Sequence, residues 1–152
     1  MKGTFILSNK WDKRFLEMAK LVASWSKDPS TQVGAIAVRN RNVIAQGYNG
    51  FPRGVDDNEI YYANRAIKYK RIVHAEMNAI YNAAENGVSL KDSTIYVIGL
   101  PICHDCAKGL IQAGISRVVT PQQEIPENWK DSVSSSQSMF DEVGIKWDWV
   151  KL

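Results

Sequence analysis

The chain has only two cysteines and two histidines among its 152 residues, and it lacks any long apolar run. Two cysteines three positions apart cannot provide the disulfide framework of a small secreted domain. No segment approaches the roughly 20 apolar residues that a membrane helix needs, and the apolar run near the N-terminus is too short for a signal peptide. We therefore expect a cytoplasmic protein without a membrane partner, in which the two cysteines bind a metal or exchange electrons.

The chain also lacks a large excess of charge of either sign. Charged residues make up 23% of it, and the formal net charge is only +3. Basic residues are spread along the sequence apart from Lys68-Tyr69-Lys70-Arg71, and so short a cluster is typical of a solvated helix end. A protein that binds nucleic acid needs a broad basic surface to hold a polyanion. The composition therefore favours small anionic ligands over nucleic acid as partners.

Length and apolar patterning predict one α/β domain over residues 1–152. The predicted helices cover residues 11–26, 55–72, 74–86, 106–113 and a segment ending near Gly144, and the predicted strands cover 33–38, 43–48, 93–98, 116–120 and 145–150. The first two strands flank a polar turn at residues 39–42 and must be antiparallel, whereas the later strand–helix–strand units favour parallel pairing. We therefore expect a mixed five-stranded sheet covered by helices.

Helical spacing also predicts which side chains face the core. In the first helix these are Phe15, Leu16, Met18, Ala19, Leu21, Val22 and Trp25, and in the helix over 74–86 they are Met77, Ile80, Tyr81 and Ala84. Gly87 follows that second helix and suits the left-handed conformation that often ends a helix.

The residues with the clearest chemical meaning are His74-Ala75-Glu76 and Cys103-His104-Asp105-Cys106. One imidazole and two thiolates suit zinc, and three protein ligands leave the fourth tetrahedral position open, as in catalytic zinc sites. The two cysteines are close to one helical turn apart, so both sulfurs can meet one ion. The predicted zinc ligands are therefore His74, Cys103 and Cys106, and His104 is expected beside the site or on the surface.

Glu76 is the predicted proton carrier. His74 and Glu76 lie about 200° apart around a helix axis, so both can reach one cavity only if His74 is at the helix start. Zinc lowers the pKa of a bound water to about 7, which generates hydroxide near neutral pH. A carboxylate beside the metal can accept that proton and pass it to a ring nitrogen and a leaving amine. His-x-Glu followed by Pro and Cys-x-x-Cys is the signature of zinc deaminases of nucleobases.

Three alternatives use the same residues differently. A nucleic-acid-editing enzyme such as a tRNA adenosine deaminase would share the metal site but needs a broad basic surface. A redox protein would use Cys103 and Cys106 as an exchanging dithiol, which leaves His74 and Glu76 without a role. A zinc-stabilised binding module would hold the metal without turnover, and replacement of Glu76 would then change only the local charge.

Several segments resemble the deoxycytidylate (dCMP) deaminase family of the cytidine deaminase-like superfamily. They are SKDPSTQVGA at 26–35, GYNGFPRG at 47–54, HAEMNAI at 74–80, CHDCAK at 103–108 and IQAGI at 111–115. The zinc motif is shared by the whole superfamily, whereas Gly-Tyr-Asn-Gly-x-Pro points to dCMP deaminases. The resemblance implies a three-layer α-β-α fold and hydrolytic deamination of dCMP to dUMP and ammonia, which feeds dTMP synthesis.

The resemblance also implies roles for individual residues. It assigns zinc binding to His74, Cys103 and Cys106, proton transfer to Glu76, substrate contacts to Asn49 and Ala75, and candidate effector or phosphate contacts to Lys27, Gly50, Phe51 and Arg53. One zinc ion per chain is expected, because residues 52–73, where some members hold a structural zinc, contain no Cys or His. The chain departs from the family pattern at Ile102, which separates Pro101 from the first cysteine.

The family resemblance further implies assembly and regulation. Members are commonly hexamers that dCTP activates and dTTP inhibits, so we expect a homo-oligomer, a hexamer in particular, with magnesium accompanying a triphosphate effector. Trp25, Tyr61 and Tyr62 are then candidate exposed aromatics at subunit contacts.

Overall fold

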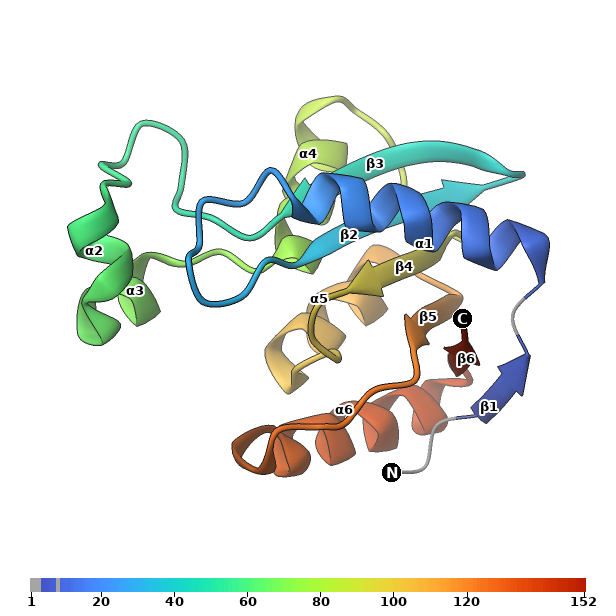
Figure 1. Ribbon diagram of the computed structural model, residues 1–152. Coiled ribbons are helices and arrows are strands. Elements are labelled where there is room, and N and C mark those ends of the chain that lie inside the picture. Colours follow the sequence, from blue (N-terminus) through green and yellow to red (C-terminus); the bar gives the residue numbers. More distant parts are fainter. Residues whose placement is uncertain (1–3, 8) are drawn as a thin grey trace.

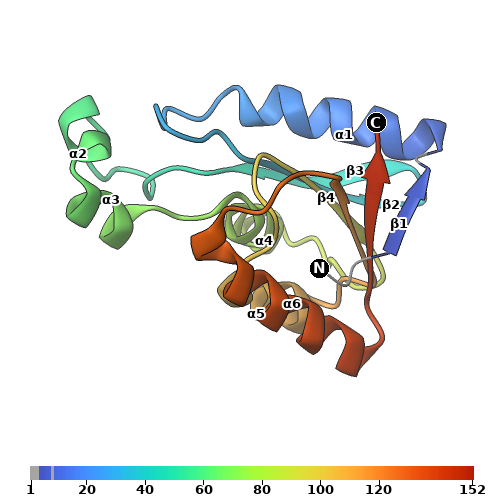
Figure 2. The same ribbon diagram turned by 60° about the horizontal axis from the view of Figure 1, so that its bottom comes forward.

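The computed structural model describes residues 4–7 and 9–152 and shows a mixed sheet with helices on both faces (Figure 1). Its six strands lie in the order β1-β6-β5-β4-β2-β3. Helix α1 (Lys10–Ala23) covers one face, while α4 (Ala75–Glu85), α5 (His104–Ala113) and α6 (Lys130–Val143) cover the other (Figure 2). The expected three-layer α-β-α arrangement is therefore confirmed.

Five of the strands are the predicted ones, namely β2 (Gly34–Arg39), β3 (Asn42–Tyr48), β4 (Thr94–Ile98), β5 (Arg117–Pro121) and β6 (Lys146–Lys151). β2 is antiparallel to both β3 and β4, and β4, β5 and β6 are parallel neighbours. Asn40 and Arg41 form the hairpin turn with φ values of 53° and 61°, the two positive values of a type I′ turn. A sixth strand, β1 (Thr4–Leu7), adds parallel to β6 at the sheet edge; its four residues are too few to show a period in the sequence.

Helix α1 packs on the sheet through a narrower face than its sequence predicts. Its buried apolar residues are Phe15, Leu16, Ala19, Val22 and Ala23. The predicted burial of Met18, Leu21 and Trp25 is wrong, since these residues are 42%, 60% and 49% exposed. The sheet covers one side of the helix only, and the helix ends at Ala23, so Trp25 lies beyond its last turn.

Helix α4 faces the sheet with alanines, which corrects the second predicted face. Ala75, Ala79 and Ala83 are buried, whereas Met77 and Ile80 are half-buried and Tyr81 and Ala84 are exposed. The cause is a close approach to β3, because a Cβ on Gly47 would collide with the backbone nitrogen of Ala79 and lie 2.5 Å from the carbonyl oxygen of Ala75. Small residues on both elements thus let the helix lie directly on the strand and fix where the helix begins.

Replacing Gly47 by alanine should therefore destabilise the protein by about 1–3 kcal/mol, the usual cost of an extra methyl group in a filled contact. Thermal unfolding followed by circular dichroism measures the effect, which is a fall of several degrees in Tm for a domain of this size. Gly50→Ala is the matched control, because a Cβ there would meet only the Tyr62 hydroxyl, at 3.6 Å. Equal Tm values for the two variants would contradict the close contact between α4 and β3.

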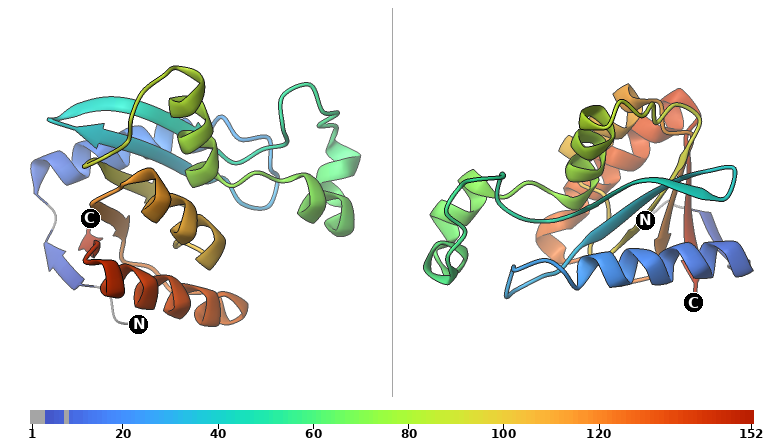
Figure 3. Two further views of the ribbon diagram at one scale, coloured as in Figure 1. Left: turned by 180° about the vertical axis from the view of Figure 1, so that it is seen from behind. Right: turned by 90° about the horizontal axis from the view of Figure 1, so that it is seen from above.

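Helices α2 (Glu59–Ala63) and α3 (Arg65–Arg71) form an insertion that projects from one end of the sheet (Figures 1 and 3), as the sequence predicts for residues 55–72. The contacts that hold it to the body include the stacked rings of Phe51 and Tyr62, with centroids 4.1 Å apart, and an ion pair between Lys68 and Asp28. Tyr62 is therefore buried, not exposed as expected. Residues 72–74 lead from α3 directly into α4, so the insertion lies next to the predicted metal ligand.

The C-terminal half follows the predicted order. Helices α5 and α6 end at Gly114 and Gly144, whose φ values of 87° and 78° are the left-handed conformation of a helix end. A 3-10 turn, η1 (Glu127–Trp129), precedes α6. Within the described residues, no helix combines the length and the apolar character that crossing a membrane requires.

Candidate metal centre and its cleft

The predicted ligands lie at the N-termini of two helices. His74 is the residue immediately before α4, and Cys103 is the residue immediately before α5, with Cys106 in the first turn of α5. The backbone N–H of Cys106 donates to the Cys103 sulfur at 3.4 Å. The position of His74 directly before α4 also meets the condition set by the sequence, because only a His at the helix start can share a cavity with Glu76.

The three ligand atoms have the spacing that a tetrahedral zinc ion needs. His74 Nδ1 lies 3.3 Å from the Cys106 sulfur and 3.4 Å from the Cys103 sulfur. Zinc bond lengths of about 2.0–2.1 Å to nitrogen and 2.3 Å to sulfur give tetrahedral edges of about 3.5 Å. Among the described residues, no other group of three His, Cys, Asp or Glu side chains brings its ligand atoms together in this way.

Only one of the three predicted ligands, Cys103, already favours the deprotonated state that a metal requires. The pKa of the Cys103 thiol lies at about 4, because its sulfur accepts hydrogen bonds from Cys106 and His74. The pKa of the Cys106 thiol is raised by its hydrogen bond to Cys103 and by burial. The pKa of His74 is raised as well, mainly by its hydrogen bond with Cys103. The cluster therefore holds protons that a bound metal displaces.

The carboxyl group of Glu76 is buried beside this cluster without belonging to it. Glu76 lies in the first turn of α4 and is 3% exposed. Burial raises the pKa of its side chain to about 7, against the opposing effect of the nearby His74. Its oxygens are not among the grouped ligand atoms, which are those of His74, Cys103 and Cys106.

The segment containing residues 47–54 is bonded to the chain on both sides of His74. Gly50 and Val73, the residue directly before His74, form an isolated antiparallel β-bridge. The nitrogen of Gly50 lies 3.1 Å from the oxygen of Val73, and the nitrogen of Val73 lies 2.7 Å from the oxygen of Gly50. Asn78 donates from α4 to the carbonyl oxygen of Tyr48 at 2.7 Å. Backbone pairing and a side-chain bond thus connect the glycine-rich segment to the start of α4.

A cleft of about 620 Å³ opens above Glu76 and His74. Its lining comes from loops far apart in the sequence: Asp28, Pro29, Ser30, Thr31, Val33, Asn49, Tyr62, Ala63, Arg65, Lys68, Tyr69, Ile72, His74, Ala75, Glu76, Leu100, Pro101, Pro126, Asn128 and Trp129. Both predicted substrate contacts, Asn49 and Ala75, are among these residues. A cleft of this volume is large enough for a nucleotide-sized ligand.

The side chain of Asn49 is engaged with the protein on three sides. Its carbonyl oxygen accepts from the Val33 N–H at 2.9 Å, and its amide donates to the Thr31 carbonyl at 2.9 Å and to Asp28 at 3.3 Å. An amide oxygen has two lone pairs, so one of them remains for a ligand hydroxyl. Asn49 thus also fixes the loop that forms one wall of the cleft.

The four candidate effector or phosphate residues lie outside the cleft lining. Lys27 pairs with Asp57 at 2.9 Å, and Arg53 pairs with Glu85 and donates to Asn82 on α4. Phe51 stacks on Tyr62, and Gly50 belongs to the β-bridge. None of the four residues therefore lines the cleft itself, although Gly50 follows Asn49 in the chain and Phe51 packs on Tyr62 of the lining.

Sequence reasoning missed several residues of the cleft. Trp129 lies in a stretch predicted only as a polar loop, and its ring centroid is 6.4 Å from that of His74 at an interplanar angle of 27°. A single tryptophan in a polar loop was the available signal. Arg65 and Lys68 also line the cleft; the sequence predicted only a helical insertion there, with a solvated helix end at residues 68–71. His104 is exposed and hydrogen-bonds Ser132 at 2.7 Å, so its predicted place outside the ligand set is correct.

Three grouped candidate ligands at paired helix starts, a carboxyl group outside that set and an open cleft are features of a catalytic rather than a structural zinc site. A family model described as the cytidine and deoxycytidylate deaminase zinc-binding region matches residues 9–122. A protein of Aliivibrio fischeri described as an uncharacterized deaminase in the luxG 3′ region is 42% identical over 146 residues, which cover 95% of this chain and 96% of that protein.

One further relative and one solved structure are similar to the chain. The deoxycytidylate deaminase of Pongo abelii is 36% identical over 142 residues, which cover 90% of this chain and 77% of that protein. The crystal structure of the dCMP deaminase from cyanophage S-TIM5 in complex with dCMP and dUMP has the same fold, with a TM-score of 0.73, 24% identity and coverage of 93% of this chain and 98% of that one.

The chain therefore belongs to the cytidine and deoxycytidylate deaminase family. It is a zinc-dependent deaminase, a hydrolase whose zinc is bound by His74, Cys103 and Cys106. The redox and non-catalytic alternatives are wrong, because the Cys pair completes the metal site of an enzyme family.

Proposed function

We propose that the enzyme deaminates dCMP to dUMP and ammonia by hydrolysis and thereby supplies dTMP synthesis. The observation that carries the proposal is the buried carboxyl group of Glu76 beside the three zinc ligands, at the floor of a nucleotide-sized cleft. The relatives named deoxycytidylate deaminase, at 36% identity over 90% of this chain, support the choice of dCMP.

The residues of the chain divide the reaction between them. When bound, zinc supplies a water acidified to near neutral pH. As the water oxygen bonds to the amino-bearing carbon, Glu76 takes one proton from the water and gives it to the adjacent ring nitrogen. Glu76 then takes the remaining proton from the new hydroxyl group and gives it to the amine, which leaves as ammonia when the C–N bond breaks and the carbonyl forms. The backbone of Ala75 and the free lone pair of the Asn49 amide oxygen hold the base and the sugar.

Deamination assays test the substrate directly. The zinc-loaded protein is given dCMP, dCTP, deoxycytidine and a tRNA anticodon stem, and release of ammonia or the ultraviolet change of the base is measured. Turnover of dCMP without turnover of tRNA supports the proposal. Activity on tRNA alone would instead support the nucleic-acid-editing alternative, which the small net charge of +3 disfavours.

Trp129 is expected to pack against the bound base, since its ring lines the cleft beside His74. Stacking on an aromatic side chain contributes about 1–3 kcal/mol per base, so Trp129→Leu should lower kcat/KM for dCMP by about 5- to 150-fold. Trp129→Phe retains an aromatic face and should lose much less. Equal kcat/KM values for the leucine and phenylalanine variants would contradict the contact.

We further propose that the enzyme is a homo-oligomer, a hexamer as in the family, activated by dCTP with magnesium and inhibited by dTTP. The exposed apolar side chains of Met18, Leu21 and Trp25, on α1 and directly after it, support assembly. The ring of Trp25 packs edge-on against that of Tyr48, with the ring centroids 6.1 Å apart. The location of Lys27, Gly50, Phe51 and Arg53 outside the cleft fits a separate effector site. Light scattering with and without each nucleotide, together with activity, tests both parts.

The two cysteines also bear on where in the cell the protein works. Both cysteines are unpaired and buried, and a thiolate zinc site is best preserved in a reducing compartment. We therefore infer a cytoplasmic location, which fluorescence microscopy of the tagged protein tests.

A further inference from the structure

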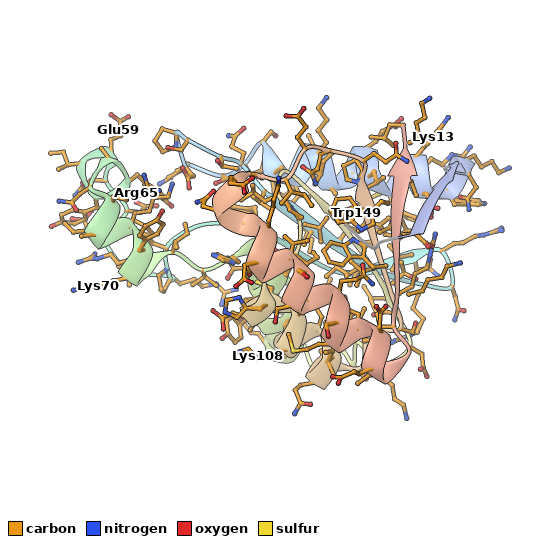
Figure 4. All side chains as sticks on the ribbon, turned by 90° about the horizontal axis from the view of Figure 1, so that it is seen from below. Lys13, Glu59, Arg65, Lys70, Lys108 and Trp149 are labelled. Carbon is orange, nitrogen blue, oxygen red and sulfur yellow. The ribbon has the colours of Figure 1, made fainter. Side chains whose placement is uncertain are left out.

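The cleft has two ends of different chemical character. His74, Ala75 and Glu76 form the metal end, and helix α3 of the insertion contributes Arg65, Lys68 and Tyr69 to the lining. Figure 4 shows Arg65 and Lys70 on this projecting insertion. A ligand that reaches from the metal to α3 must therefore present one end to zinc chemistry and the other to cationic side chains.

The charge of Lys68 is already compensated inside the protein. Its ammonium group lies 2.8 and 2.9 Å from the two oxygens of Asp28, and the side chains of Lys68 and Asp28 are 17% and 2% exposed. Asp28 also accepts from the backbone N–H groups of Ser30 and Thr31, at 2.9 and 3.3 Å. Lys68 thus neutralises a buried carboxylate that would otherwise repel an anion, and it fixes α3 to the loop of the cleft wall.

The charge of Arg65 is not compensated in this way. Within the described part of the chain, no carboxylate forms a salt bridge with it; its Nε donates to the Tyr69 hydroxyl at 2.9 Å, and its guanidinium lies 5.3 Å from the centroid of the Tyr69 ring. An arginine has five N–H donors in a planar fork. One of them is taken by Tyr69, so the four terminal N–H groups remain for a ligand.

From this arrangement we infer that Arg65 binds the 5′-phosphate of the nucleotide substrate, with Tyr69 and the Lys68–Asp28 pair as positioning residues. This inference rests on the proposed deamination of a nucleotide at the metal end. A guanidinium fork pairs with two phosphate oxygens at once, which suits Arg65 to a phosphate group at this end of the cleft. The insertion therefore selects nucleotides over nucleosides.

The decisive comparison is Arg65→Gln assayed on dCMP and on deoxycytidine, which differ only in the phosphate. Loss of charge-assisted hydrogen bonds should lower kcat/KM for dCMP by about 10- to 100-fold, chiefly through KM. The value for deoxycytidine should not change. Lys70→Gln is the matched control, because it removes one charge from the same helix outside the cleft lining.

Binding of the product adds a readout independent of turnover. Calorimetry with dUMP and deoxyuridine should show weaker dUMP binding by Arg65→Gln, unchanged dUMP binding by Lys70→Gln, and an intermediate effect of Tyr69→Phe, which removes the acceptor of the Arg65 Nε–H. Unchanged dUMP affinity in Arg65→Gln would overturn the inference, as would an equal loss for dUMP and deoxyuridine. Absence of deamination by the wild-type enzyme would instead overturn the proposed function, so the two failures are distinguishable.

Discussion

Replacing Glu76 by glutamine should reduce kcat for dCMP by about 10²–10⁴-fold, the usual range for loss of one general acid–base group. The upper part of the range is expected, because the same carboxyl group is proposed to move protons to both the ring nitrogen and the leaving amine. Glutamine keeps the size and the hydrogen-bonding shape of the side chain but cannot accept a proton. The loss should therefore appear in kcat, with little change in KM.

The variant should keep its zinc, since the Glu76 oxygens are not among the three grouped ligand atoms. Metal content by plasma emission spectroscopy and Tm by circular dichroism separate a chemical defect from a structural one. Glu142→Gln is a suitable control, because Glu142 is an exposed glutamate on α6, outside the cleft lining. Activity of Glu76→Gln close to that of the control would refute proton transfer by Glu76.

The sequence was sufficient for the metal site because its residues are local. His74 and Glu76 share one helix start, and Cys103 and Cys106 share another, so spacing and helix boundaries predict four side chains without knowledge of the tertiary fold. The parallel and antiparallel pairing of β2 to β6 was also predictable, because hairpins and strand–helix–strand units constrain direction. In each case, chain connectivity alone limits the geometry.

The cleft lining outside the metal ligands could not be predicted in the same way. Arg65 and Lys68 on α3, Asp28 in a loop and Trp129 after β5 meet only through packing, and nothing in their local spacing indicates a shared cavity. The prediction of the buried face of α4 was wrong for a related reason. Its alanines face the sheet because Gly47 on β3 admits a close approach, a property of two elements and not of the helix alone.

Loss of one metal ligand has the second large expected effect, and Cys103→Ser is the most direct test. A serine hydroxyl stays protonated at neutral pH, whereas zinc requires the thiolate that Cys103 readily forms with a pKa of about 4. We expect the variant to lose zinc and deaminase activity together. It should also unfold at a lower temperature, because a metal that binds only the folded state stabilises it by about 4 kcal/mol at a concentration 1,000 times its Kd.

For a domain of this size, that stabilisation corresponds to a Tm difference of about 10 °C. Wild-type protein stripped by a chelator should unfold close to the Tm of Cys103→Ser, and added zinc should raise the Tm of the wild type only. His104→Asn provides the matched control, because this histidine lies between the two cysteines, bonds Ser132 and is outside the ligand set. Full zinc occupancy in Cys103→Ser, or loss of zinc from His104→Asn, would mean that the ligands are wrongly assigned and that a different side chain completes the zinc site.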